Sequence, residues 1–257
     1  MRALLLGFGY TASFLKPALL QLESDCNVVT TSRKPGQDVV FDLMDETTWS
    51  RLPQVDVTFW SFPAKPLDQV QRFWQTQSQQ LGQVIAVGTT GSFVTESEHQ
   101  IVNERTPLDR AQERVQGETF LRENGAIVVH AAGIYGPGRN PISWVRRGLV
   151  GPSEKLLNVI HVLDLADLMV ATLSEGQPGA LYLAADGEPF TWKDLIESWQ
   201  SAFDLKLPEN PRFSSRPSKR VDPSATFQKL HFSPKVKNVK KGVEDLMKGE
   251  GHGDQAQ

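Results

Sequence analysis

The sequence is poor in residues that several classes of protein need. Its 257 residues include a single cysteine, Cys26, which excludes a disulfide framework and a cysteine-rich zinc site. No apolar run approaches the roughly 18 residues that a membrane-spanning helix needs. The net charge is only −3, so the whole chain is not a polycation of the kind that binds nucleic acid. We therefore expect no metal site, no membrane partner and no nucleic-acid partner.

The charge is unevenly spread along the chain. Residues 212–248 hold ten Lys and Arg against three acids, a local charge of +7 that leaves −10 for the remainder. Such a segment can face a polyanion or a phosphate-bearing ligand, or it can be a solvated surface. We prefer the solvated surface. Residues 249–257 lack large apolar side chains, and we expect a disordered tail there.

Apolar periodicity predicts alternating strands and helices. We expect strands at 2–6, 27–31, 39–41, 55–60, 84–87 and 126–130, and helices at 10–23, 66–81 and 108–123. This alternation is typical of a doubly wound α/β fold with a parallel sheet. After it we expect a long loop over 133–153, then helices over 160–173 and 191–203. The sequence thus predicts a Rossmann-type domain over 1–165 and a smaller C-terminal, substrate-binding portion over 166–248.

The N-terminus allows two interpretations. Met1-Arg2 followed by Ala3 and three leucines resembles the start of a signal peptide, but Gly7 and Gly9 interrupt the apolar run. A secretory core needs about 7–15 apolar residues. We therefore interpret 2–6 as a short strand buried on both faces and expect a cytoplasmic protein.

The predicted first strand ends in a glycine-rich loop. This loop fits the G-x-G-x-x-G/A pattern with Gly7, Phe8, Gly9, Tyr10, Thr11 and Ala12. Gly7 permits a tight turn, Gly9 lets backbone N–H groups approach a pyrophosphate, and Ala12 keeps the following helix close to the strand. The helix N-terminus stabilises the phosphate charge. Dinucleotide binding is the interpretation we favour, and an ordinary strand–helix turn with two glycines is the alternative.

The end of the second strand bears on the choice of dinucleotide. An NAD site usually has an acid about 20 residues after the loop, whereas this chain has Ser32, Arg33 and Lys34 there. A guanidinium suits a 2′-phosphate, so we expect NADP(H) in preference to NAD(H), with Ser32 and Arg33 as phosphate contacts. The missing acid also counts against S-adenosylmethionine. Arg33 and Lys34 as ordinary loop charges remain the alternative.

Five segments together resemble a known family. They are the glycine loop, 87–93 (VGTTGSF), 103–107 (NERTP), 133–139 (GIYGPGR) and 159–166 (VIHVLDLA). Through them the chain resembles the extended short-chain dehydrogenase/reductases of the NAD-dependent epimerase/dehydratase family, and it is most similar to the atypical bacterial subgroup of the YeeZ type. The resemblance covers about residues 1–248.

The resemblance implies further cofactor contacts. Asp42 would bond the adenine amine, although a helix cap or turn residue explains it equally well. Residues Ser61, Phe62 and Pro63 would line the cofactor with backbone, and Thr89 and Arg114 would lie near the nicotinamide ribose. Family members often dimerise through two helices, which correspond here to 66–81 and 108–123, so a homodimer is one expectation.

The chain departs from the family at the catalytic residues. The family uses a Ser or Thr, a Tyr and a Lys, in which the Tyr exchanges a proton with the substrate hydroxyl. Thr90 matches the first position, but Arg110 and Arg114 replace the Tyr and the Lys. A guanidinium with a pKa above about 12 cannot transfer that proton at neutral pH. Tyr135 is then the one tyrosine to consider as a substitute acid, with a packed aromatic as the better alternative.

Other residues admit both functional and structural interpretations. Arg139 and Trp144 could contact an anionic substrate, or they could be an exposed charge and a packed ring. We interpret His161 and Asp164 as packing and capping residues and His130 as a core histidine. We expect an oxidoreductase or epimerase that acts on a small hydroxyl or carbonyl compound. The alternative is a cofactor-binding sensor without turnover.

Overall fold

The computed structural model describes residues 1–253 of the chain, with side chains described up to residue 249. A seven-stranded parallel sheet forms its centre, in the order β11-β7-β5-β4-β1-β2-β3. Its strands are β1 (Arg2–Leu6), β2 (Asn27–Ser32), β3 (Val39–Val40), β4 (Val57–Trp60), β5 (Gln83–Thr89), β7 (Ile127–Ala131) and β11 (Leu181–Ala184). The predicted Rossmann-type α/β fold is confirmed.

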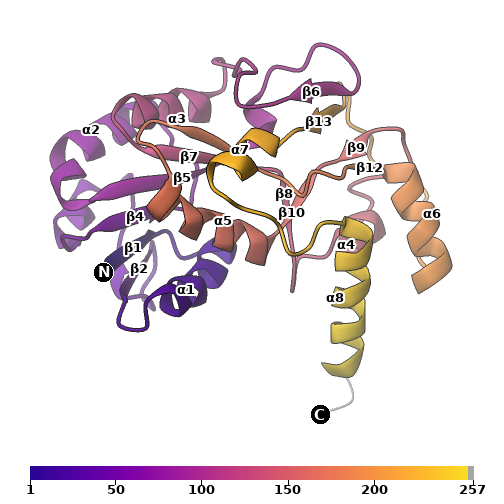
Figure 1. Ribbon diagram of the computed structural model, residues 1–257, viewed down its shortest axis with the longest axis horizontal. Helices are drawn as coiled ribbons and strands as arrows, with labels where there is room; N and C mark the ends of the chain where they lie inside the picture. The colour runs from indigo at the N-terminus through magenta and orange to yellow at the C-terminus, as the bar shows by residue number, and fades with distance from the viewer. Residues whose placement is uncertain (254–257) are drawn as a thin grey trace.

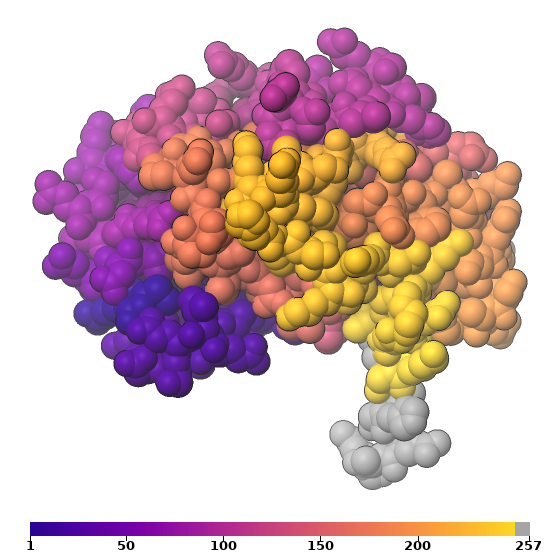
Figure 2. Space-filling model, viewed as in Figure 1, coloured from indigo at the N-terminus to yellow at the C-terminus, as the bar shows by residue number. Residues whose placement is uncertain are grey.

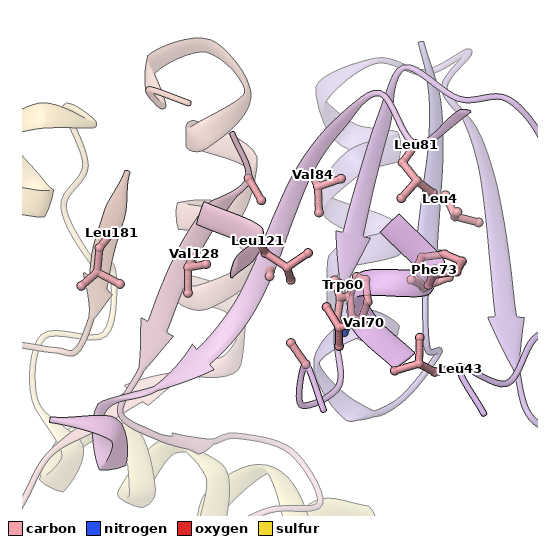
Figure 3. Close-up of a cluster of buried hydrophobic side chains, with 14 of the residues drawn as sticks. Leu4, Leu43, Trp60, Val70, Phe73, Leu81, Val84, Leu121, Val128 and Leu181 are labelled. Atoms are coloured by element: carbon pink, nitrogen blue, oxygen red, sulfur yellow. The ribbon is translucent and has the colours of Figure 1, made fainter. Parts of the chain in front are cut away.

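Helices cover both faces of this sheet (Figure 1). One face packs against α1 (Tyr10–Leu22) and α5 (Val162–Glu175), and the other packs against α2 (Leu67–Gln77) and α3 (Glu113–Glu123). The central strands are buried on both sides, which explains why β1 and β4 are continuous apolar runs. Figure 3 shows one of these layers, in which Trp60 of β4 meets Val70 and Phe73 of α2.

Three small two-stranded sheets build the rest of the molecule. They are β8 (Gly133–Tyr135) with β10 (Val159–His161), β9 (Leu156–Leu157) with β12 (Phe190–Thr191), and β6 (Gln100–Val102) with β13 (Lys219–Val221). The remaining helices are η1 (Glu46–Arg51), η2 (Ser78–Gln80), η3 (Thr90–Ser92), α4 (Pro141–Arg146), α6 (Trp192–Phe203), α7 (Ser224–Lys229) and α8 (Val239–Gly253). In Figure 2 the C-terminal residues, in orange and yellow, lie across the middle of one face of the molecule.

The boundary predicted at residue 165 falls inside α5. Helix α5 crosses it, and β11, from beyond it, pairs in parallel with β7 and completes the central sheet. The C-terminal portion therefore supplies part of the sheet as well as packing on it. No helix in the described part of the chain has the length and apolar character needed to cross a membrane.

Two local predictions are wrong. The expected loop over 133–153 contains β8 and α4, because β8 gains a strand partner, β10, that lies far away in sequence, and because Asn140 caps α4 through a hydrogen bond from Ile142 N (3.0 Å). The expected disordered tail from 249 is wrong for 249–253, which belong to α8. Once Val239 and Val243 anchor that helix in the core, extending it costs less than starting one. Residues 254–257 of the tail lie outside the described residues.

Candidate functional site

Two cavities lie at the carboxyl ends of the central strands and share a wall. The first, of about 490 Å³, is lined by residues at or just after the ends of β1, β2, β3 and β4: 7–9, 32, 33, 41–44, 61–63 and 65. The second, of about 500 Å³, is lined by residues at or just after the ends of β1, β4, β5 and β7: 9–11, 61–63, 87–90 and 131–134, with Arg114 and Arg139. Both include Gly9 and 61–63, so they form one groove. The groove crosses the point where the strand order reverses, which is where open α/β sheets bind ligands.

The glycine loop has the geometry that the sequence predicts. Gly7 has φ +89°, and a Cβ there would lie 2.8 Å from Cδ1 of Phe62, so only glycine fits without a shift. At Gly9 a Cβ would meet nothing within 4 Å, so the backbone there is open to the groove. No side chain caps the N-terminus of α1. Its first N–H groups and its dipole are therefore available to an anion such as a pyrophosphate.

Thr31 holds this loop in place, a role that no sequence pattern indicates. Its hydroxyl accepts a hydrogen bond from Gly7 N (2.9 Å) and donates one to Leu5 O (3.3 Å). Its carbonyl accepts from Phe8 N (2.7 Å). In the sequence Thr31 is an ordinary β-branched strand residue, so only the pairing of β2 with β1 brings it under the loop.

The first cavity contains the residues expected to contact a 2′-phosphate. Ser32 and Arg33 both line it, and Lys65, which the sequence analysis missed, adds a second exposed cation. The Ser32 hydroxyl donates to the carbonyl of Lys34. Asp42 is compatible with both expectations, a cofactor contact and a turn residue. It lines the cavity, and one of its carboxylate oxygens accepts a hydrogen bond from Met44 N (3.0 Å) in a turn.

The second cavity gathers the residues expected near the reacting atoms. Thr89 is the last residue of β5, Thr90 begins η3 directly after it, and Arg114 projects from the first turn of α3. Arg110 is exposed in the turn before α3 and lines neither cavity. Of the two arginines that replace the family's Tyr and Lys, only Arg114 is therefore at the groove.

A buried polar network holds Arg114 in place. Its guanidinium contacts Glu118 Oε1 at 2.9–3.0 Å, and Glu118 Oε2 lies 2.9 Å from His130 Nε2. Glu118 and His130 are both fully buried. Because a carboxylate only accepts, the His130 hydrogen lies on Nε2, and the other ring nitrogen has no partner in the described structure. A Cβ on Gly88 would lie 2.1 Å from the His130 ring, so that glycine makes room for the network. His130 is a core histidine, as predicted, and it also supports a residue at the groove.

Arg139 lies over the glycine loop. Its guanidinium carbon is 5.5 Å from the centre of the Tyr10 ring, and the Tyr10 hydroxyl donates to Pro137 O (3.1 Å). The loop after β8 and the start of α1 are thereby joined at the second cavity. Arg139 adds positive charge beside the uncapped end of α1, which is where an anionic group is best stabilised.

Two predicted site residues do not reach the groove. Tyr135 is fully buried and lines neither cavity. Its ring centre lies 5.2 Å from that of His161. Its hydroxyl packs closely against α8, where a Cβ added to Gly242 would lie 2.2 Å from it. Burial raises the pKa of this phenol far above its usual value. A proton-transfer role for Tyr135 is therefore not supported, and the packed-aromatic interpretation fits. Trp144 is half-buried against Trp192 and lines neither cavity.

The residues interpreted as structural have structural contacts. The His161 ring accepts a long hydrogen bond from Leu163 N (3.4 Å) at the start of α5. Asp164 accepts from the backbone N–H groups of Lys235 (2.8 Å) and Val236 (2.9 Å), which ties the chain before α8 to α5. Among the described residues, no group of three or more His, Cys, Asp and Glu is placed to hold a metal ion.

Lys219, which was not predicted from the sequence, contacts a residue that lines the second cavity. It lies on β13, and its ammonium donates to the main-chain carbonyl of Thr90. In the sequence it is one of ten basic residues in a segment interpreted as solvated. Only the parallel pairing of β13 with β6 brings it beside the end of β5.

Comparisons with known proteins bear on the fold. No family model and no curated protein sequence matches the chain. Among solved structures, a conserved protein of unknown function from Silicibacter pomeroyi DSS is similar, with 24% identity over 96% of this chain and 98% of that one and a TM-score of 0.77.

Several neighbours are described with a bound dinucleotide, and two of them illustrate the similarity. One is dTDP-glucose 4,6-dehydratase from Bacillus anthracis in complex with NAD, with 13% identity, 98% of each chain covered and a TM-score of 0.78. The other is RMD from Pseudomonas aeruginosa complexed with NADPH, with 16% identity, coverage of 96% of this chain and 97% of that one, and a TM-score of 0.76. Sugar epimerases also share the architecture. The chain therefore has the Rossmann-type fold of these dinucleotide-binding epimerases and dehydratases.

Proposed function

We propose that the protein is an NADP(H)-binding oxidoreductase, or an epimerase or dehydratase of that type, acting on a sugar-like or other small hydroxyl or carbonyl compound. The observation that carries this proposal is the single groove described above. It holds the glycine loop and Arg33 at one end and Thr90 with Arg114 at the other. The structural neighbours with bound NAD or NADPH support the same coarse function. Within it, we assign the chain to the atypical YeeZ-type subgroup.

The residues present fit a nicotinamide dinucleotide. The open backbone at Gly9 and the uncapped N-terminus of α1 would hold its pyrophosphate, and Ser32, Arg33 and Lys65 would face the 2′-phosphate. Arg114 would hold the ribose hydroxyls on the nicotinamide side. When bound, such a cofactor supplies or accepts a hydride. Thr90 would orient the substrate oxygen beside it.

The experiment that tests the proposal is a calorimetric titration with NADPH and with NADH. We expect NADPH to bind more tightly, and we expect Arg33→Ala to weaken NADPH by about tenfold or more while leaving NADH nearly unchanged. The reason is the loss of a charge-assisted contact to the 2′-phosphate, where tenfold corresponds to about 1.4 kcal/mol. Arg51→Ala, an exposed arginine away from both cavities, is the matched control. Absence of binding by either nucleotide refutes the proposal.

A second candidate function is a cofactor-binding sensor without turnover. The replacement of the family's Tyr and Lys by Arg110 and Arg114 favours it. Oxidation of NADPH across a panel of carbonyl compounds separates the two. Turnover that disappears in Thr90→Ala supports the enzyme, and tight NADPH binding without turnover of any compound supports the sensor.

A further inference from the structure

The guanidinium of Arg114 is held on one side and open on the other. Its Nε donates to Glu118 Oε1 (3.0 Å), and its Nη2 lies 2.9 Å from the same oxygen. The Arg114 side chain is 24% exposed and lines the second cavity, whereas the Glu118 side chain is 2% exposed. Because a guanidinium carries more N–H donors than this pairing uses, the remaining donors are the ones that a ligand in the cavity can reach.

Glu118 is itself held by a residue of another element. Its Oε2 accepts from Nε2 of His130 (2.9 Å), which lies on β7. The His130 ring is fully buried and packs edge to face on Phe93, with 5.3 Å between the ring centres. The Glu118 carboxylate therefore bridges α3 and β7, and it cannot turn without breaking one of its two contacts.

An arginine depends on such support more than the lysine that it replaces in the family pattern. The ammonium of a lysine rotates its donors freely, whereas the donors of a guanidinium are confined to one plane and act only when that plane faces the acceptor. Glu118 sets the plane of Arg114 by contacting two of its nitrogens. His130 in turn sets the position of the carboxylate.

The pairing also decides which chemical group Arg114 suits. The Glu118 carboxylate balances the charge of the guanidinium, so the donors that face the cavity belong to a pair with no net charge. Adjacent hydroxyl groups, such as those of a ribose, accept from these donors without bringing an unbalanced charge into the cavity. By contrast, Arg139 lines the same cavity and forms no ion pair within the described residues, so its charge is available to an anionic group.

We propose that Glu118 and His130 are positioning residues that aim Arg114 at the ribose on the nicotinamide side of the dinucleotide. The affinity for that half of the ligand then depends on a buried pair of side chains that the ligand does not touch. This inference rests on the proposed function, which assigns the ribose to Arg114. It makes no demand on the adenosine half, whose expected contacts line the first cavity.

The first test uses two ligands that share one half. NADPH contains both halves, whereas adenosine 2′,5′-bisphosphate contains the adenosine half alone. By calorimetry we expect Glu118→Gln to weaken NADPH by about fivefold to tenfold and to leave adenosine 2′,5′-bisphosphate within about twofold, because a neutral amide holds the guanidinium less firmly. Unchanged binding of the smaller ligand also shows that the variant is folded.

Glu123→Gln, at an exposed position of the same helix, is the matched control and is expected to bind both ligands as the wild type does. Wild-type affinity for NADPH in Glu118→Gln overturns the proposal. An equal loss for both ligands also overturns it, because a general disturbance of the fold would weaken the two alike.

The second test asks whether Glu118 acts through Arg114. Arg114→Met removes the donors and is expected to weaken NADPH by about tenfold. Adding Glu118→Gln to Arg114→Met is then expected to change the NADPH affinity by less than about twofold, since the residue that Glu118 aims is already absent. A double variant whose loss equals the product of the two separate losses overturns the proposal, because independent effects add in free energy.

The third test concerns His130 and keeps Glu118 intact. His130→Gln retains a donor for the Glu118 carboxylate, so we expect its NADPH affinity to stay within about threefold of the wild type. His130→Leu removes the donor and is expected to weaken NADPH about as much as Glu118→Gln does. Equal NADPH affinity in the two His130 variants overturns the positioning role of His130.

These outcomes separate the inference from the proposed function. A wild-type protein that binds neither ligand rejects the proposed function. A wild-type protein that binds NADPH, with a loss in Arg114→Met and none in Glu118→Gln, rejects only the positioning role of the buried pair.

Discussion

The two cavities of the groove are built in different ways. The cationic residues of the first cavity, Arg33 and Lys65, are exposed. In the second cavity Thr90 is buried, and Arg114 rests on Glu118 and His130 inside the core. A side chain can change at the first cavity at little cost in stability, whereas a change at the second disturbs buried polar groups.

The largest expected effect comes from breaking the network behind Arg114. Glu118→Ala leaves the His130 ring without a partner and removes the counter-charge of Arg114, so we expect a loss of about 3 kcal/mol in the free energy of unfolding. Urea denaturation measures it. Glu123→Ala, at an exposed position on the same helix, is the control and is expected to change stability by less than about 0.5 kcal/mol.

The variant Arg33→Ala tests the stability effect of a change at the first cavity. We expect its stability to equal that of the wild type within about 0.5 kcal/mol, since the side chain is exposed. If Glu118→Ala proved as mild as Arg33→Ala, the contrast between the two cavities would be wrong.

An effect that depends on pH is expected at Asp186. It lies beside β10, with its backbone N–H bonded to Val159 O (2.7 Å), and one of its carboxylate oxygens has no partner in the described structure. Burial raises its pKa to about 8. A carboxyl that holds its proton more tightly when folded stabilises the protein at low pH, and this contribution is lost as the pH rises towards 8.

The measurement is stability against pH for the wild type and for Asp186→Asn. Between pH 5 and 8 we expect the wild type to lose up to about 1 kcal/mol per pH unit relative to the variant, because the amide cannot ionise. Parallel curves for the two proteins would show that Asp186 keeps an ordinary pKa.

The smallest expected effect is that of Tyr135→Phe. The Tyr135 hydroxyl is buried and has no hydrogen-bond partner in the described structure, so its removal is expected to change stability by less than about 1 kcal/mol, in either direction. We also expect NADPH binding and any turnover to stay unchanged. A large fall in kcat with normal stability would show that the Tyr135 hydroxyl takes part in the reaction.

Features of the fold could be predicted from the sequence where local pattern and function coincide. Strands β1 to β5 and β7 followed from apolar periodicity, the turn at Gly7 from glycine spacing, and the placement of Arg114 at the groove from the family resemblance. The short strand β6 was not predicted. Prediction failed where a partner far along the chain decides the structure. The pairing of β8 with β10 converts a predicted loop into a strand.

The same distinction applies to the site. Thr90 could be predicted because it directly follows a buried strand and matches a motif. Lys219 could not be predicted, because it is 129 residues away from Thr90 in the chain, and a lysine in a basic segment is by composition a solvated residue.

Local patterns in the amino-acid sequence are enough to predict the alternation of strands and helices, and with it a parallel sheet whose carboxyl ends form a groove after a glycine loop. These features depend on the period of apolar residues and on glycine conformations, which neighbouring residues decide. The set of polar groups that meet at the second cavity follows from the folded arrangement alone. Burial and the neighbours that folding supplies set the charge state of Lys219 and Asp186, the support of Arg114 and the exclusion of Tyr135, and no local pattern encodes them.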